Sequence, residues 1–242
     1  MARKSFDQFI DQLKGQILFL GSIVEQSTIE AINALTRGDF TAARTICQRN
    51  LFINEKCFAI EYAILEKIAT QAPMAHDLRV LTATFHVANE LKQMGQYARS
   101  IARVILKISD EDFRVPGREF QEMARLSVGM LHKSLSAFIN ENFSLARQIP
   151  AEDDQVDELY IKIYHILVSN MIANPDTIDQ ANYLLWVAHN LERMADRVVN
   201  ICERTIFICT GELLELDQDE NLIPLVPKVK LKDQFIFPIV NS

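Results

Sequence analysis

The feature that most constrains the fold is an internal repeat. A shift of the chain by 103 positions, from Phe40 to Phe143, aligns identical residues, and a shift of 100 positions, from Met94 to Met194, aligns more of them further along. The identities are Phe40, Ala43, Arg44, Ile46, Glu55 and Ile60 with Phe143, Ala146, Arg147, Ile149, Glu158 and Ile163, then Val87, Ala88, Leu91, Met94 and Ile101 with Val187, Ala188, Leu191, Met194 and Ile201. The three-residue change falls at an interhelix turn, where length varies at little cost, so we predict two copies of one unit.

Each copy has the periodicity of three long helices. Apolar residues recur every three to five positions from Phe9 to Leu35, after which Gly38 should end the helix and Asp39 should cap the next. Further helices are expected over residues 40–69, 76–108, 118–140, 143–172 and 177–209, with Pro150 kinking the fifth or delaying its regular start. Only 7 of 242 residues are glycine, which favours few, long elements. The prediction is an all-α fold of two tandem three-helix bundles with six long helices, over residues 1–112 and 113–215, and an extended tail over 216–242.

Charge and composition narrow the function. The net charge of −7 has the wrong sign for a protein that mainly binds nucleic acid. The apolar run over residues 17–24 is too short to span a bilayer, and no signal peptide is recognised, so a soluble cytoplasmic protein is expected. The four cysteines include no CxxC pair and are expected to be buried, reduced thiols.

Acidic residues of the second repeat fall four apart on two helices. Asp153 and Asp157 share one face of the fifth helix, and Glu192 and Asp196 share the outer face of the sixth, where Asn200 and Glu203 continue the stripe. Neighbouring antiparallel helices can bring these carboxylates together. Hard cations such as Mg, Mn or Fe, with Zn as a further candidate, suit such a cluster. A solvated acidic face with ion pairs to Arg193 and Arg197 is the alternative, and spacing alone does not decide between the two.

The first repeat lacks these acids. The equivalent positions hold Asn50, Asn54, Lys92 and Gln96, and Arg103 stands where the second repeat has Glu203. A multinuclear metal centre is therefore predicted on the second repeat only. Two destinations stay open for Lys92, Arg99 and Arg103, namely glutamates of the same repeat or an acidic partner surface.

The strongest motif carries a resemblance to a known family. Residues 190–203 read NLERMADRVVNICE, which resembles the "ERIGD…NIxE" signature of the PhoU family of phosphate-specific transport accessory proteins. The run DDQVD at 153–157 is similar to the E/D-x-x-x-D motif of that family, and AHDLR at 75–79 resembles its "xxDLR" entry to the third helix. The likeness covers roughly residues 6–214 and includes the duplication.

This resemblance implies a cytoplasmic, non-enzymatic regulator, usually a homodimer, with at most peripheral association with membrane complexes. Such proteins contact the ATPase of the phosphate ABC transporter and a sensor histidine kinase, and they repress the phosphate-starvation response when phosphate is plentiful. It also implies multinuclear metal ligation by Asp153, Asp157, Glu192 and Asp196, with Asn200 and Glu203 as additions. The first repeat departs from the family pattern, because amides and a lysine replace the acids.

Two other interpretations stay open. The chain could be a helical bundle whose main function is to bind metal, or an adaptor that has diverged towards another membrane partner. A ferritin-like oxidase is disfavoured because none of the five histidines follows a glutamate in a Glu-x-x-His pair. Alternating apolar residues and lysines between prolines predict a strand-like tail after Gly211, which could dock on its own bundle, a dimer mate or a partner.

Overall fold

A computed structural model describes residues 2–108, 115–216 and 223–224. The first repeat consists of α1 (Ala2–Arg37), α2 (Phe40–Gln71) and α3 (His76–Ile105). Gly38 ends α1 with a φ of 65°, a left-handed conformation that glycine adopts without a Cβ clash. Asp39 then caps α2, because its Oδ1 accepts hydrogen bonds from the N–H groups of Thr41 at 3.0 Å and Ala42 at 2.9 Å. Both predictions for this turn are confirmed.

The second repeat follows the same plan with one interruption. It consists of α4 (Gly117–Ile139), α5 (Phe143–Gln148), the 3₁₀ turn η1 (Ile149–Glu152), α6 (Asp153–Ala173), the 3₁₀ turn η2 (Pro175–Thr177) and α7 (Ile178–Thr210). The single helix predicted over 143–172 is thus divided at Pro150, which lacks an N–H and crowds the preceding turn. As a result, a regular α-helix begins at Asp153, the first of the predicted metal-ligating residues.

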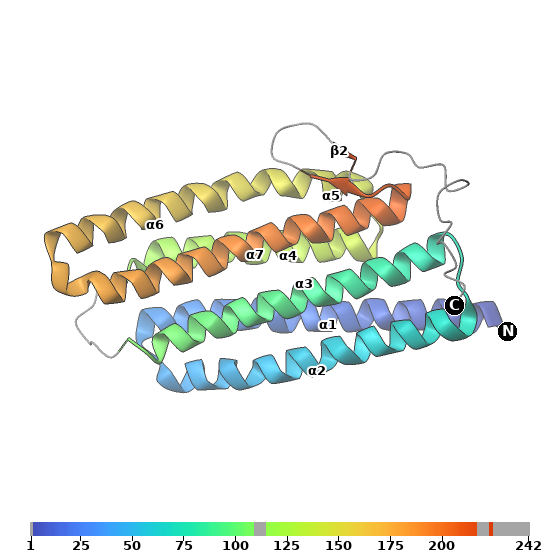
Figure 1. Ribbon diagram of the computed structural model, residues 1–242, viewed down its shortest axis with the longest axis horizontal. Helices are drawn as coiled ribbons and strands as arrows, with labels where there is room; N and C mark the ends of the chain where they lie inside the picture. Colours follow the sequence, from blue (N-terminus) through green and yellow to red (C-terminus); the bar gives the residue numbers. More distant parts are fainter. Residues whose placement is uncertain (1, 109–114, 217–222, 225–242) are drawn as a thin grey trace, which may run out of the picture.

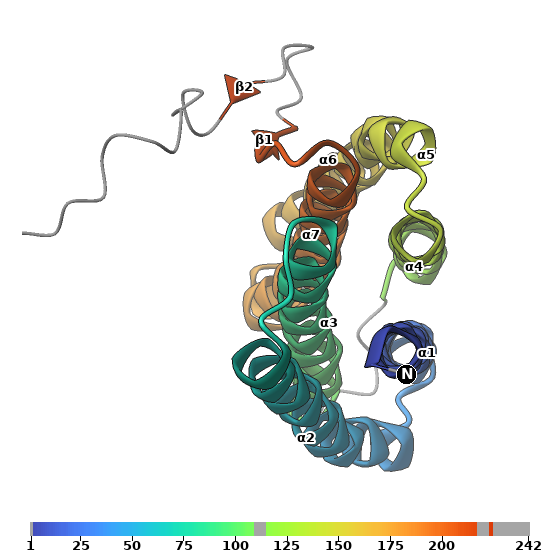
Figure 2. The same cartoon turned by 90° about the vertical axis from the view of Figure 1, so that its right-hand side faces the viewer.

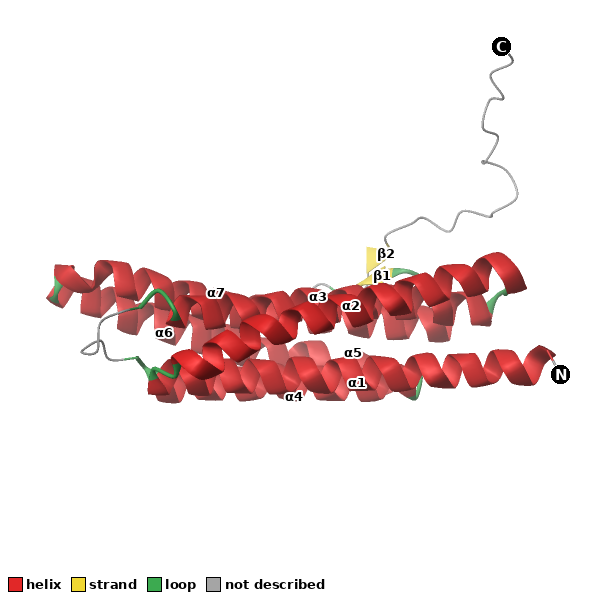
Figure 3. Cartoon of the chain, turned by 90° about the horizontal axis from the view of Figure 1, so that it is seen from below, coloured by secondary structure: helices red, strands yellow, loops and turns green. Residues whose placement is uncertain are grey.

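The helices run roughly parallel or antiparallel in two layers (Figures 1 and 3). Viewed end-on, α2, α3, α7 and α6 form a curved row, and α1 and α4 lie against its inner side (Figure 2). Within the first repeat, α1 and α2 pack against α3. Within the second repeat, α4 and α6 pack against α7. Between the repeats, α3 contacts α7 and α1 contacts α4. The all-α, duplicated fold predicted from the sequence is confirmed, and the two bundles share two long seams.

Equivalent positions of the repeats form equivalent parts of the core. The matched residues of α3 and α7 are completely buried in both copies: Val87, Ala88, Leu91, Met94 and Ile101 with Val187, Ala188, Leu191, Met194 and Ile201. Burial of each of the larger side chains in this set contributes about 1.5–3 kcal/mol to stability. Matched apolar stripes are therefore enough to specify matched helix packing. The repeat seen in the sequence is therefore a repeat of the core.

The described segment directly after α7 is no longer helical, and it lies against α7. Gly211 ends α7 with a φ of 76°, and a short strand β1 (Leu214–Glu215) pairs antiparallel with β2 (Ile223–Pro224). The rest of the predicted strand-like tail lies outside the described residues. Within the described part, no helix is both long and apolar enough to cross a membrane. The cysteines there are unpaired, with Cys57 and Cys202 buried and Cys209 exposed, so the expected burial does not hold for all four.

Candidate functional site

Two of the predicted ligands lie in the first two turns of α6. Asp153 is the first residue of this helix and is only 3% exposed, whereas Asp157, one turn later, is partly exposed. Their four-residue spacing places both on one face of α6. The interruption at Pro150 thus fixes where this pair begins along the second repeat.

The other two lie on α7, which packs against α6. Glu192 and Asp196 are four residues apart, and both interact electrostatically with Asp157 across the helix pair. Burial, followed by the charges of Asp196 and Asp157, raises the pKa of Glu192 to about 7. Burial and the charge of Asp157 raise the pKa of Asp196 in the same direction. The structure therefore brings Asp157, Glu192 and Asp196 together as a mutually repelling cluster, which we call the acidic cluster.

Basic neighbours compensate this cluster only in part. The charges of Arg193 and Arg197 oppose the increase in the pKa of Asp196, but both side chains also have partners in the first repeat. Arg197 Nη1 lies 3.3 Å from Glu90 Oε2, and its Nε donates to the Tyr97 hydroxyl at 3.4 Å. Arg193 lies over the Tyr97 ring, 5.8 Å from the centroid. The two arginines therefore interact with α3 as well as with the acidic cluster, and they link α7 to α3.

His189 is a neighbour of the cluster that sequence reasoning did not assign. Its Nδ1 lies 3.1 Å from Glu192 Oε2, and its ring meets Trp186 edge-to-face at 6.3 Å between centroids. Glu192 Oε2 is nevertheless buried without a hydrogen bond in this arrangement. The signal for His189 was its spacing of three residues from Glu192, one of the two spacings that place side chains side by side on a helix.

The remaining two predicted ligands extend along α7. Asn200 lies one turn beyond Asp196 and is partly exposed. Glu203 is anchored differently, since its Oε1 accepts a hydrogen bond from the Leu216 N–H at 2.9 Å. Burial raises the pKa of Glu203, and the charges of Glu215 and Glu90 act in the same direction. In this structure Glu203 holds the segment after α7 against the helix.

The donor chemistry of the acidic cluster fits a hard cation. A bound cation would relieve the repulsion that raises the pKa of Glu192, and the buried Glu192 oxygen has no hydrogen bond to lose. With the side chains as they lie, however, no three acidic, histidine or cysteine residues of the described ranges are close enough to hold one ion together. Ligation would therefore require rotation of these side chains, which their partial exposure permits.

The first repeat has a different arrangement at the equivalent positions. Lys92 Nζ lies 3.6 Å from Glu61 Oε1 and 4.8 Å from the centroid of the Phe58 ring, so this lysine does pair with a glutamate of its own repeat. Asn50 is 1% exposed, and neither polar atom of its side chain has a hydrogen-bond partner. The two repeats thus share a core but differ in the charge of this face.

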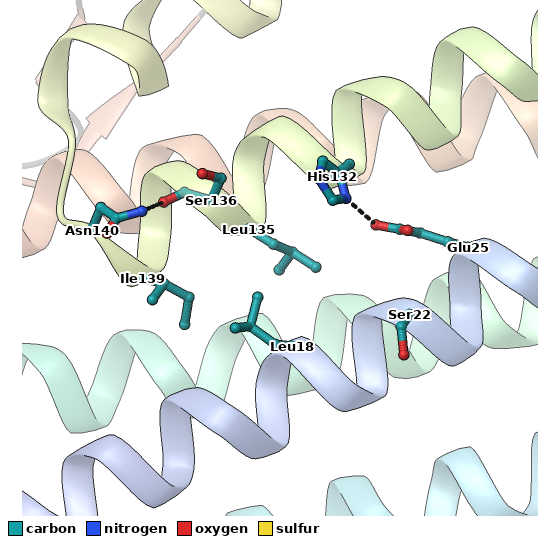
Figure 4. Close-up of a pocket in the computed structure, with 8 residues that line it drawn as sticks. All are labelled: Leu18, Ser22, Glu25, His132, Leu135, Ser136, Ile139 and Asn140. Carbon is teal, nitrogen blue, oxygen red and sulfur yellow. Dashed lines mark hydrogen bonds and ion pairs between the residues drawn. The ribbon is translucent and has the colours of Figure 1, made fainter.

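A cavity with one polar end lies where α1 contacts α4. Its volume is about 360 Å³, and it is lined mainly by apolar atoms, with Leu18, Leu135 and Ile139 pointing into it (Figure 4). At one end Glu25 Oε1 lies 3.3 Å from His132 Nδ1, and burial raises the pKa of Glu25 although His132 opposes the shift (Figure 4). This contact between Glu25 and His132 links the two repeats.

The fold and the acidic cluster together define a duplicated helical bundle with a polyanionic face on one copy. The family model described as "PhoU domain" matches twice, at residues 17–105 and 120–205, once in each repeat. The chain belongs to the PhoU family.

Similar proteins agree over most of the chain. A "phosphate-specific transport system accessory protein PhoU homolog" of Clostridium acetobutylicum is 30% identical over 218 residues, which cover 90% of this chain and 100% of that one. The accessory protein PhoU of Edwardsiella tarda is 30% identical over 86% of this chain and 85% of its own. The crystal structure of the regulatory protein PhoU of Streptococcus pneumoniae superposes with a TM-score of 0.79 at 29% identity, covering 86% of this chain and 98% of that one.

Proposed function

We propose that this chain is an accessory protein of a phosphate-specific transport system that represses phosphate uptake and the phosphate-starvation response when phosphate is plentiful. The observation that carries this proposal is the double match to the PhoU domain, supported by relatives of that description aligned over most of their length. The proposed partners are the ATPase of the phosphate ABC transporter and a sensor histidine kinase. We further propose that the protein acts in the cytoplasm as a homodimer and that it regulates by binding rather than by bond chemistry.

Deletion of the encoding gene tests this function. At high phosphate the deletion strain should derepress alkaline phosphatase, and the wild-type gene supplied in trans should restore repression. Pull-down from membranes with and without phosphate should recover the ATPase and the kinase. Unchanged alkaline phosphatase in the deletion strain would contradict the regulatory function, and light scattering of the purified protein checks the dimer.

A second function, metal binding by the acidic cluster, is favoured by the pKa of about 7 at Glu192. Asp153, Asp157, Glu192 and Asp196 would hold the ion, with Asn200 and Glu203 as further ligands if the segment after α7 moves. A bound cation would neutralise the cluster and fix α6 against α7. Fe, Mn, Mg and Zn are the candidates, and the second repeat is the only proposed site because the first carries Asn50, Asn54, Lys92 and Gln96.

Elemental analysis after growth in metal-rich medium tests this site. The wild type should carry metal that a variant with Asp157→Asn and Asp196→Asn has lost. Asp154→Asn is the matched control, since Asp154 lies on the same helix but is exposed. Absence of metal from the wild type, or equal loss in the control, would contradict the metal site and leave the regulatory function to its own test.

A further inference from the structure

A second cleft of about 360 Å³ lies on the seam between α3 and α7. Ser100 and Arg103 of α3, with Lys107 just after it, form one side, and Tyr183, Trp186 and Asn190 of α7 form the other. The two helices lie side by side along this seam (Figure 1). Since α3 belongs to the first repeat and α7 to the second, the cleft exists only because the two bundles pack together.

The charge of this cleft is opposite to that of the whole chain. Arg103 and Lys107 line it, no acidic residue of the described ranges does, and the chain as a whole carries −7. In the part of the chain that the structure describes, neither cation has an ion pair with a carboxylate, although Lys107 Nζ lies 5.4 Å from the centroid of the Tyr183 ring. Two cations at the edge of a small cleft are suited to bind a phosphate or another anion.

The internal repeat supplies a comparison for this cleft within the same molecule. A shift of 100 positions relates Arg103 to Glu203 and Asn190 to Glu90, and it relates Trp186 to His86. The charge of Glu90 raises the pKa of Glu203 and the charge of Arg204 opposes it, so the related place holds two carboxylates with one cation and lacks the indole. The combination of cations and large aromatic rings is therefore particular to one of the two related places and does not follow from the duplication.

The aromatic side of the cleft is unusually open to solvent. Trp186 is the only tryptophan of the chain, and it is 63% exposed. Asn190 Nδ2 donates to the carbonyl oxygen of Trp186 at 2.6 Å, and the indole meets the His189 ring edge-to-face at 6.3 Å between centroids. An exposed indole beside a tyrosine offers a stacking surface for a planar ring.

We propose that this cleft binds a phosphorylated small molecule with a planar ring, of the nucleotide class. Arg103 and Lys107 would hold the phosphate groups, Trp186 and Tyr183 would stack on the ring, and the polar groups of Ser100 and Asn190 would hydrogen-bond to the part between. The cleft volume is at the lower end of the range for small-molecule sites, which matches a mononucleotide better than a larger cofactor. None of the residues that line this cleft belongs to the acidic cluster, although Trp186 contacts His189, which lies against Glu192.

Trp186 itself reports on occupancy of the cleft. Titration of the full chain with ADP should quench tryptophan fluorescence and saturate, and calorimetry should give the same dissociation constant. Adenosine keeps the planar ring but lacks the phosphates, and inorganic phosphate lacks the ring. Each should bind at least about tenfold more weakly than ADP. Raising the salt concentration should weaken ADP binding, since the charges lie at the protein surface.

Variants separate this site from general attraction to a cationic surface. By calorimetry, Arg103→Gln with Lys107→Gln should weaken ADP binding at least about tenfold, and so should Trp186→Ala. Lys56→Gln, which removes an exposed lysine of α2, should leave binding unchanged. The proposal is overturned by absence of saturable ADP binding at millimolar concentration, by phosphate binding as tightly as ADP, or by an equal loss in Lys56→Gln. The proposal is also overturned if an acidic peptide quenches Trp186 fluorescence saturably and ADP does not.

Discussion

At the scale of single residues, the second repeat concentrates negative charge where the first does not. Glu192 shows the consequence most clearly, because burial and the charges of Asp196 and Asp157 raise its pKa to about 7. The equivalent residue, Lys92, is paired with Glu61 instead. Several substitutions on the surface of an otherwise matched core thus turn this face into a repelling one, and the protein bears that repulsion unless a cation or a proton relieves it.

This repulsion predicts a pH dependence of stability. The pKa of Glu192 in the folded protein lies above the ordinary glutamate value of 4.5, so the folded state binds more protons than the unfolded state and loses stability as pH rises from about 4.5 through 7. Glu192→Gln should be more stable than the wild type at pH 8 by ~1–2 kcal/mol, a value reduced for solvent screening, and the difference should shrink by pH 5. Urea unfolding with a metal chelator present measures this. A variant that is less stable than the wild type at pH 8 would contradict the electrostatic account.

At the scale of secondary-structure elements, helix ends were set by particular residues. Gly38 and Asp39 close α1 and begin α2, while Pro150 divides the predicted fifth helix and delays α6 until Asp153. These residues act through local backbone geometry, which does not depend on distant contacts. Such positions are therefore the ones where the sequence alone located a boundary.

Two glycines give a matched test of this local control. Gly38 has a φ of 65° and Gly15 lies in α1, and a Cβ at either position would meet nothing within 4 Å. Gly38→Ala should destabilise the protein by ~1 kcal/mol because alanine is strained in the left-handed region. Gly15→Ala should stabilise it by ~0.5–1 kcal/mol by favouring the helix. Thermal or urea unfolding of both variants checks the pair, and the same sign for both would rule out the conformational explanation.

At the scale of the whole molecule, the two repeats are joined along two seams. α3 meets α7 through Arg197 and Glu90, and α1 meets α4 through the Glu25–His132 pair and apolar packing. At the second seam Gly21 allows close approach, since an added Cβ would overlap Leu135 Cδ1. Figure 4 shows Leu135 pointing from α4 towards α1. The proposed nucleotide cleft depends on the first seam, so the packing of the repeats also creates sites.

Close approach at the α1–α4 seam can be tested with Gly21→Val. The added side chain should overpack against Leu135 and cost ~1–3 kcal/mol, even though valine itself suits a helix better than glycine. Leu135→Ala in the same chain should recover part of that loss, so the two changes should be less than additive. Unfolding free energies of both single variants and the double variant give the coupling. Strict additivity would show that the seam is not tightly packed at Gly21.

The sequence determined the all-α class, the duplication and most helix bounds, because the apolar periodicity and the turn residues that encode them are local. It also named the four acids of the second repeat, and their spacing placed each pair on one helical face. Only the tertiary structure decided that Asp157, Glu192 and Asp196 repel one another, that Glu203 binds the Leu216 N–H, and that Arg103 faces Trp186 across the repeats. These outcomes depend on how helices far apart in the chain rotate and pack against each other, and periodicity along a single helix does not contain that information.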